Sequence, residues 1–140
     1  MKTPKIINLT DTDETDILDI SEIQPGERTV ELLHPGTGQK LGISVRIMSA
    51  DDPRLKREQR ALMDRQSERH RKNKILTAEE IESAMVKYLA QTITGWDWGK
   101  RKLNGETPEF SVRKAIEILT EFQWIRSQIN DAVGDTAAFF

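Results

Sequence analysis

Residues 41–48 alternate strictly between large aliphatic and other side chains, and this period of two constrains the fold more than any other part of the chain. The aliphatic positions are Leu41, Ile43, Val45 and Ile47. Such a pattern predicts a half-buried β-strand. Residues 35–39, Pro-Gly-Thr-Gly-Gln, tolerate the backbone angles of a turn and follow a shorter predicted strand at 29–34. Together the two segments predict a β-hairpin, and its long connection favours a bulge in the register.

A lone hairpin is only marginally stable in water, so helices must cover its apolar face. Asp52-Pro53 predicts the start of a helix that runs to about residue 73. Thr77 and Glu80 form a capping box that opens an amphipathic helix ending at Gly95.

The last third of the chain predicts further helices. Residues 96–105 read as a connecting loop with an Asn-Gly turn at 104–105. Ser111 opens another helix, and residues 122–133 continue as a last helix or a kinked extension. The sequence therefore predicts an α+β fold, mainly α, in which a small N-terminal β-hairpin packs on a bundle of about four helices.

Residues 1–27 differ from the rest in composition. They combine clustered Asp, Glu and Thr with scattered aliphatic residues, which predicts a flexible acidic N-terminal arm, with a short strand over Lys5–Leu9 as the alternative. A chain of 140 residues suffices for one domain and rarely for two. We expect an arm at 1–27 and a single hairpin-plus-helices domain at 28–140.

Cysteine is absent, which excludes disulfides and thiolate metal ligands and fits a reducing compartment. The N-terminal residues contain no apolar run of signal-peptide length, and no window approaches the ~20 apolar residues of a membrane span. We therefore expect a cytoplasmic protein with no membrane partner.

The predicted helix from Pro53 is polar nearly all round, so it is either solvated or available to a partner. Its cations could contact nucleic-acid phosphates. They are Arg54, Lys56, Arg57, Arg60, Arg65, Arg69, Arg71, Lys72 and Lys74. Interspersed carboxylates, cations on all sides and a net charge of -2 disfavour nucleic acid. A solvated face or a protein-binding surface fits better.

Residues for catalysis are scarce. His34 lies in the predicted hairpin turn and His70 in the charged helix, so they form neither a metal site nor a nucleophile–base pair. The Pro-Gly-Thr-Gly turn lacks the Lys-Ser or Lys-Thr ending of a phosphate-binding loop. We expect no enzyme activity, no cofactor and no metal.

The aromatic residues pose two questions. Trp96 and Trp98 alternate in the predicted loop, so one could point inward and one outward. Phe139 and Phe140 end the chain, either tucked into a groove or kept for a partner.

The ordered set of these segments resembles the tail assembly chaperones of long-tailed (siphovirus-type) bacteriophages. The resemblance covers residues 28–140. It is carried by the hairpin VELLHPGTGQKLGISVRI entering "DDP", by the ending "QTITGW" of the central helix, and by the closing segment "WIRSQINDAVGDTAAFF".

This resemblance implies a mainly helical fold with a small hairpin and no enzymatic activity. It also implies a protein that binds the tape-measure protein, keeps it soluble and hands it to the tail-tube protein. Self-association, a frameshifted longer form, the cytoplasm of the infected bacterial host and absence from the mature virion belong to the same implication.

A chaperone for a long amphipathic helix needs exposed apolar contacts and a charged exterior. Six residues are candidate partner-binding positions on that reasoning. They are Leu55, Leu62, Met63, Trp98, Phe139 and Phe140. The alternative function is a small phage nucleic-acid-binding or regulatory protein that uses the basic helix 54–74.

Overall fold

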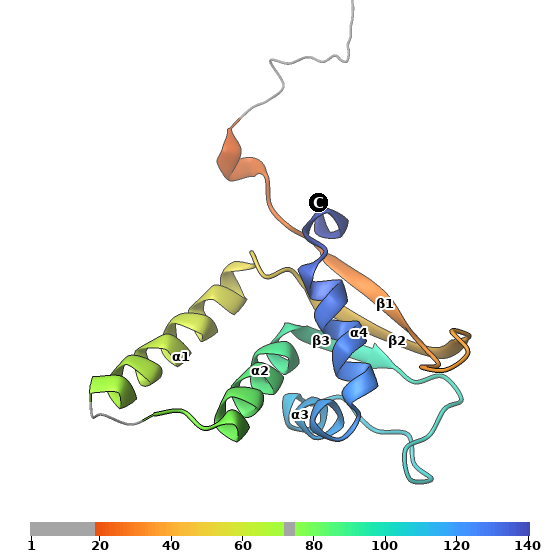
Figure 1. Ribbon diagram of the computed structural model, residues 1–140. Helices are drawn as coiled ribbons and strands as arrows, with labels where there is room; N and C mark the ends of the chain where they lie inside the picture. The colour runs from red at the N-terminus through yellow and green to blue at the C-terminus, as the bar shows by residue number, and fades with distance from the viewer. Residues whose placement is uncertain (1–18, 72–74) are drawn as a thin grey trace, which may run out of the picture.

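The computed structural model describes residues 19–71 and 75–140, with the side chains of Leu62 and residues 66–71 outside the description. Within this part of the chain, four α-helices and a three-stranded antiparallel sheet confirm the predicted α+β, mainly α class (Figure 1). The strands are β1 (Glu27–Leu33), β2 (Lys40–Met48) and β3 (Ile93–Asp97). The α-helices are α1 (Pro53–Arg71), α2 (Ala78–Thr92), α3 (Val112–Glu121) and α4 (Gln123–Gly134), and short 3-10 turns are η2 (Ile20–Glu22) and η3 (Thr136–Phe139).

The predicted hairpin is confirmed as β1 and β2. Their antiparallel register shifts between Glu31 and Leu33, which is the bulge that the long connection favoured. His34 has a structural role in the turn, because its Nδ1 accepts hydrogen bonds from the amides of Gly36 and Thr37 at 3.0 and 3.1 Å.

The predicted loop after the central helix is wrong at its start, because it contains β3. α2 opens at the predicted capping box but ends at Thr92 instead of Gly95. β3 pairs antiparallel with β2, which becomes the central strand. The local sequence does not predict β3, because the strand that supplies its hydrogen bonds lies some fifty residues earlier in the chain.

β3 also settles the orientation of the two tryptophans. Asp97 pairs with Ser44 on the exposed face, whereas Trp96 pairs with Val45 on the core face. Trp98 is buried, and Trp96 packs partly buried against the same core. The expectation of one inward and one outward ring is therefore wrong, because residues two apart in an extended segment share a face.

The core lies between one face of the sheet and helices α2, α3 and α4. Leu32, Val45 and Ile47 from the sheet belong to the same buried cluster as residues from the helices. The helical members include Val86, Leu89, Ile118, Leu119, Ile125 and Ile129. Phe122 caps the C-terminus of α3 and the N-terminus of α4, so the last two helices are joined by one residue in an extended conformation.

Side-chain and backbone groups cover both ends of the edge strand β1. The Gln128 side chain accepts from the Leu33 amide at 2.9 Å and donates to the Leu33 carbonyl at 2.8 Å, as a neighbouring strand would. At the other end the Gly26 amide donates to the Phe139 carbonyl at 2.8 Å. These contacts protect an edge that would otherwise be free to pair with another chain.

Candidate protein-binding surface

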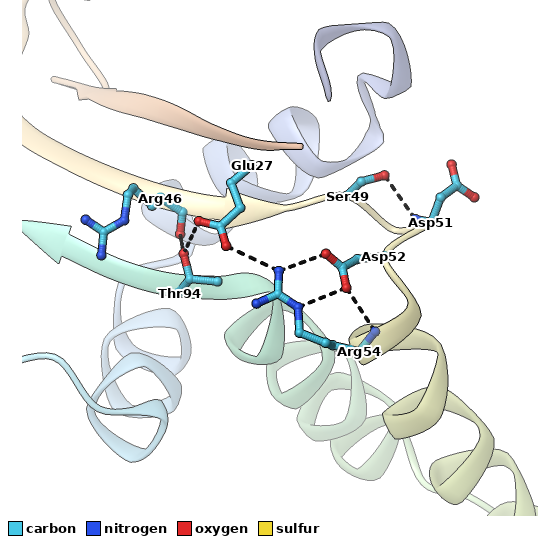
Figure 2. A network of polar contacts seen from close by, with 7 residues as sticks. All are labelled: Glu27, Arg46, Ser49, Asp51, Asp52, Arg54 and Thr94. Atoms are coloured by element: carbon cyan, nitrogen blue, oxygen red, sulfur yellow. Dashed lines mark hydrogen bonds and ion pairs between the residues drawn. The ribbon is translucent and has the colours of Figure 1, made fainter. Parts of the chain in front are cut away.

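Helix α1 is attached to the body mainly through its first turn. Leu55 is fully buried. Asp52 accepts hydrogen bonds from the Arg54 amide at 2.9 Å and from the Arg54 guanidinium at 3.0 and 2.8 Å. Arg54 also pairs with Glu27 of β1 at 3.2 Å, and Glu27 accepts from the Thr94 hydroxyl of β3 at 3.0 Å (Figure 2). The network ties the start of α1 to two strands of the sheet.

This network sets the charge of its central carboxylate. The hydrogen bond from Arg54 holds the pKa of Asp52 below its usual range, although burial acts in the opposite direction. The pKa of Arg54 is raised, chiefly by the same hydrogen bond to Asp52. The pair therefore stays ionised at neutral pH, which also places a negative charge at the N-terminus of α1.

Beyond its first turn α1 makes little contact with the core. Among its described side chains, Leu55 is the only one that is buried. Figure 1 shows α1 diverging from the sheet and lying beside α2. Long polar helices that leave a core in this way are either solvated or bound by a partner.

A groove of about 130 Å³ lies between the two helices. Its apolar walls are Leu55 of α1, Tyr88 of α2 and Ile116 of α3, and charged or amide side chains rim it. The rim residues are Glu58, Gln59, Arg65, Lys87 and Gln91. Burial and the nearby charge of Asp51 raise the pKa of Tyr88, so the phenol is neutral at physiological pH.

Exposed apolar side chains gather on the two helices and the segment between them. Met63 of α1 is 63% exposed and Ile75 before α2 is 88% exposed. Ile81 and Met85, one turn apart on α2, are 53% and 45% exposed. We call these four residues and the groove the α1–α2 surface. None of the four lines the groove itself, and Met85 lines a separate recess with Gln123 and Arg126 of α4. Exposed apolar side chains on neighbouring elements are typical of a protein-binding surface.

The structure places the six predicted contact residues in three groups. Leu55, Trp98 and Phe139 are buried by the protein's own fold, so they are not free surface contacts. Met63 and Phe140 are exposed, and the side chain of Leu62 lies outside the description. Only Met63 joins the α1–α2 surface, with Leu55 contributing to the wall of the groove.

Leu55, Trp98 and Phe139 are each buried for a physical reason that the neighbouring sequence does not show. Leu55 is the anchor of α1, and Trp98 follows a strand that the sequence did not predict. Phe139 is held beside β1, with the Arg28 guanidinium 5.9 Å from the centre of its ring. Phe139 is therefore buried and Phe140 is exposed. Of the two alternatives for the terminal pair, the first applies to Phe139, and Phe140 stays available to a partner.

Ile75, Ile81 and Met85 were missed as surface residues. Ile81 and Met85 fit the helical spacing of the predicted amphipathic helix, and that spacing alone does not show which of its apolar residues stay uncovered. The core instead takes Val86, Leu89 and Ala90. The signal that could have found the exposed pair is an apolar arc too wide for a single packing partner.

No group of three or more metal-binding side chains stands together in residues 19–71 and 75–140. None of the helices described is long and apolar enough to cross a bilayer.

Comparison of the chain with protein-family models, with curated proteins and with solved structures finds no match in any of the three.

Proposed function

We propose that this protein is a non-enzymatic tail assembly chaperone that binds a tape-measure protein through its α1–α2 surface. Two observations carry the proposal. A groove with apolar walls lies between α1 and α2, and Met63, Ile75, Ile81 and Met85 of these helices and the segment between them are exposed. The family resemblance of residues 28–140 supplies the identity of the partner.

The chemistry of the surface suits an amphipathic helix as the client. Such helices bind by placing side chains of one apolar stripe into a groove, with charged groups at its margins. The partly exposed Tyr88 and Ile116 offer apolar walls over the buried Leu55. Glu58, Arg65 and Lys87 offer charges of both signs at the rim. A tape-measure protein is a long helix of this kind, and covering its stripe would keep it soluble before assembly.

The rest of the proposed role follows from the resemblance. The chaperone would work in the cytoplasm of the infected bacterial host, associate with copies of itself and release the tape-measure protein to the tail-tube protein. It would be absent from the mature virion, which mass spectrometry of purified particles can test.

The test is capture of a tagged tape-measure fragment by purified protein. Ile81→Lys combined with Met85→Lys should weaken capture about tenfold or more, because two cations would replace apolar contacts. Leu33→Lys is the matched control, since Leu33 is a partly exposed aliphatic residue of β1, outside the α1–α2 surface. Equal capture by all three proteins would remove the α1–α2 surface from the proposal.

Exposed cations support nucleic-acid binding as a second candidate function. Lys56, Arg57, Arg60 and Arg65 are all exposed on α1, the helix that diverges from the body. Binding through phosphates would fall steeply as salt rises, whereas apolar docking would not. A mobility-shift assay at low salt with Arg57→Gln, Arg60→Gln and Arg65→Gln separates the two functions. A salt-sensitive shift abolished by these changes would favour nucleic acid.

A further inference from the structure

A second recess, of about 360 Å³, opens at the hairpin end of the sheet. Three aromatic side chains, Trp98, Phe122 and Trp124, form part of its wall. Leu41, Leu103 and Ile125 add aliphatic surface, and Arg101 and Lys102 complete the lining on one side. We call this recess, which shares no residue with the groove beside α1, the aromatic cleft.

The cations beside the aromatic cleft lack acidic partners. Lys100, Arg101 and Lys102 are consecutive and exposed, and within the described residues none forms an ion pair with a carboxylate. The Arg101 Nε donates to the Leu41 carbonyl at 2.8 Å, which fixes the guanidinium at the edge of the cleft. The cleft therefore combines an apolar wall with unneutralised positive charge.

Trp98, which lies between the core and the cleft, carries an unpaired polar group. Its indole N–H is buried and has no hydrogen-bond acceptor in the described part of the chain. A buried donor without an acceptor is costly, by roughly 1–3 kcal/mol. An entering segment with a carbonyl or carboxylate oxygen could supply the missing acceptor after a small movement of the ring.

The acidic N-terminal segment has the complementary chemistry. Residues 9–18, Leu-Thr-Asp-Thr-Asp-Glu-Thr-Asp-Ile-Leu, place four carboxylates between aliphatic residues. The described part just after this segment does not join the core of its own chain, since Ile20 and Ile23 are 81% and 57% exposed. Carboxylates match the cations of the cleft, and leucine or isoleucine matches its apolar wall.

The described residues that precede β1 run away from the aromatic cleft of their own molecule. Residues 20–26 lead away from the hairpin turn, beyond the opposite end of β1 (Figure 1). β1 alone is about 23 Å long, at 3.3 Å for each of its seven residues. Asp16 lies three residues before Asp19, which is at most about 11 Å of chain, so this carboxylate of the same molecule falls short of the hairpin end. The direction of residues 20–26 and this short reach favour a second copy as the source of the segment.

We propose that the aromatic cleft of one copy binds residues 9–18 of a second copy. The described residues that follow the donor segment lie at the end of the sheet opposite the cleft. Segment and cleft are different surfaces, so the contact is heterologous and joins copies into rings or open chains. The inference specifies the self-association that belongs to the proposed function and rests on that part of it. Its tests use the protein alone, so their failure leaves tape-measure binding unaffected.

Disulfide trapping tests the contact directly, because the natural chain has no cysteine. Thr15→Cys in one preparation and Lys100→Cys in another are mixed and oxidised gently. We expect a mixed disulfide-linked dimer in much higher yield than with Thr120→Cys, which replaces an exposed residue of α3. Equal yields with Lys100→Cys and Thr120→Cys would overturn the proposal, as would rapid internal cross-linking in a diluted monomer carrying both Thr15→Cys and Lys100→Cys.

Sedimentation of the full chain tests the charge complementarity. Arg101→Glu with Lys102→Glu should weaken self-association about tenfold or more. Arg57→Glu with Arg60→Glu on α1 is the matched control and should leave it unchanged. Circular dichroism verifies that both variants fold. Unchanged assembly of the cleft variant, or equal loss in both, would contradict the assignment.

A peptide of residues 1–18 provides the third readout. It contains no tryptophan, whereas Trp98 and Trp124 line the cleft and Trp96 lies 6.1 Å from Trp98. Adding the peptide to the full chain should dissociate assemblies while tryptophan fluorescence still reports an occupied cleft. If the peptide leaves assembly intact, residues 9–18 do not join the copies through the cleft and the proposal is overturned.

Discussion

Asp52 is the centre of the polar attachment of α1. It accepts three hydrogen bonds from Arg54, two of them from the guanidinium, and so fixes both the first turn of the helix and its link to Glu27 (Figure 2). The sequence predicted Asp52 as a capping residue, from its place before a proline. It did not predict the reach of Arg54 to β1, because that contact depends on how the hairpin and the helix are arranged in space.

The lowered pKa of Asp52 makes its contribution to stability pH-dependent. Because the folded state prefers the carboxylate, the stabilisation is present above the ordinary value of about 3.9 and is lost as pH falls through the lowered folded value. Asp52→Asn keeps a capping oxygen and loses the charge, so it should cost up to about 1 kcal/mol at pH 7. Urea unfolding at pH 7 and pH 2 should show this difference shrinking at acid pH. A constant difference would contradict the prediction.

Gly99 requires its missing side chain for two reasons. Its φ is +57°, and an added Cβ would lie 2.8 Å from the Gly42 carbonyl oxygen. Gly99→Ala should therefore destabilise the protein by about 2–3 kcal/mol. Gly38→Ala is the control, since its φ is +75° with open space around the added atom, and it should cost only about 1 kcal/mol. Equal losses in thermal unfolding would show that the close approach to Gly42 does not matter.

At the scale of elements, the sequence predicted the helix starts and the turn that depend on interactions between residues close in the chain. The capping box of Thr77 and Glu80 opens α2, Ser111 caps α3 at the Lys114 amide, and Asn104 and Gly105 with positive φ form the predicted turn. β3 was missed because a short β-branched segment after a helix becomes a strand only when a distant strand offers hydrogen bonds. A flexible arm was predicted for residues 1–27. Residues 1–18 of it lie outside the described residues, so the flexibility of the arm stays a prediction.

Helix α1 should open independently of the rest of the fold. Leu55 is the one buried anchor among its described side chains, so Leu55→Ala should remove about 2–3 kcal/mol from the attachment of the helix. Hydrogen exchange should then accelerate along α1 while β2 and α4 keep their protection. Equal acceleration in all three elements would show that α1 and the core unfold as one unit.

At the scale of the whole molecule, a compact core supports two apolar recesses in different places. The sheet with α2, α3 and α4 forms the core, the α1–α2 surface lies beside the diverging helix, and the aromatic cleft lies at the hairpin end. A client and a second copy could thus bind at the same time. This division of surfaces suits a chaperone that must cover a long helix with many copies.

The binding surfaces were less predictable than the fold. Apolar residues chosen for their isolation in the sequence, such as Leu55 and Phe139, proved to be buried by distant elements. Met85 fits the helical spacing of α2 and is nevertheless exposed. Helical spacing shows that a residue lies on an apolar arc, and only the arrangement of neighbouring elements decides which part of the arc remains uncovered.

The most direct test of the central claim, that this protein shields apolar surface on a tape-measure protein, is co-expression of the two in bacteria. The soluble fraction of the tape-measure protein should rise severalfold with the natural chain and return to its unassisted level with Ile81→Lys and Met85→Lys. The same soluble fraction with the natural chain, with this variant and with no chaperone would contradict the account.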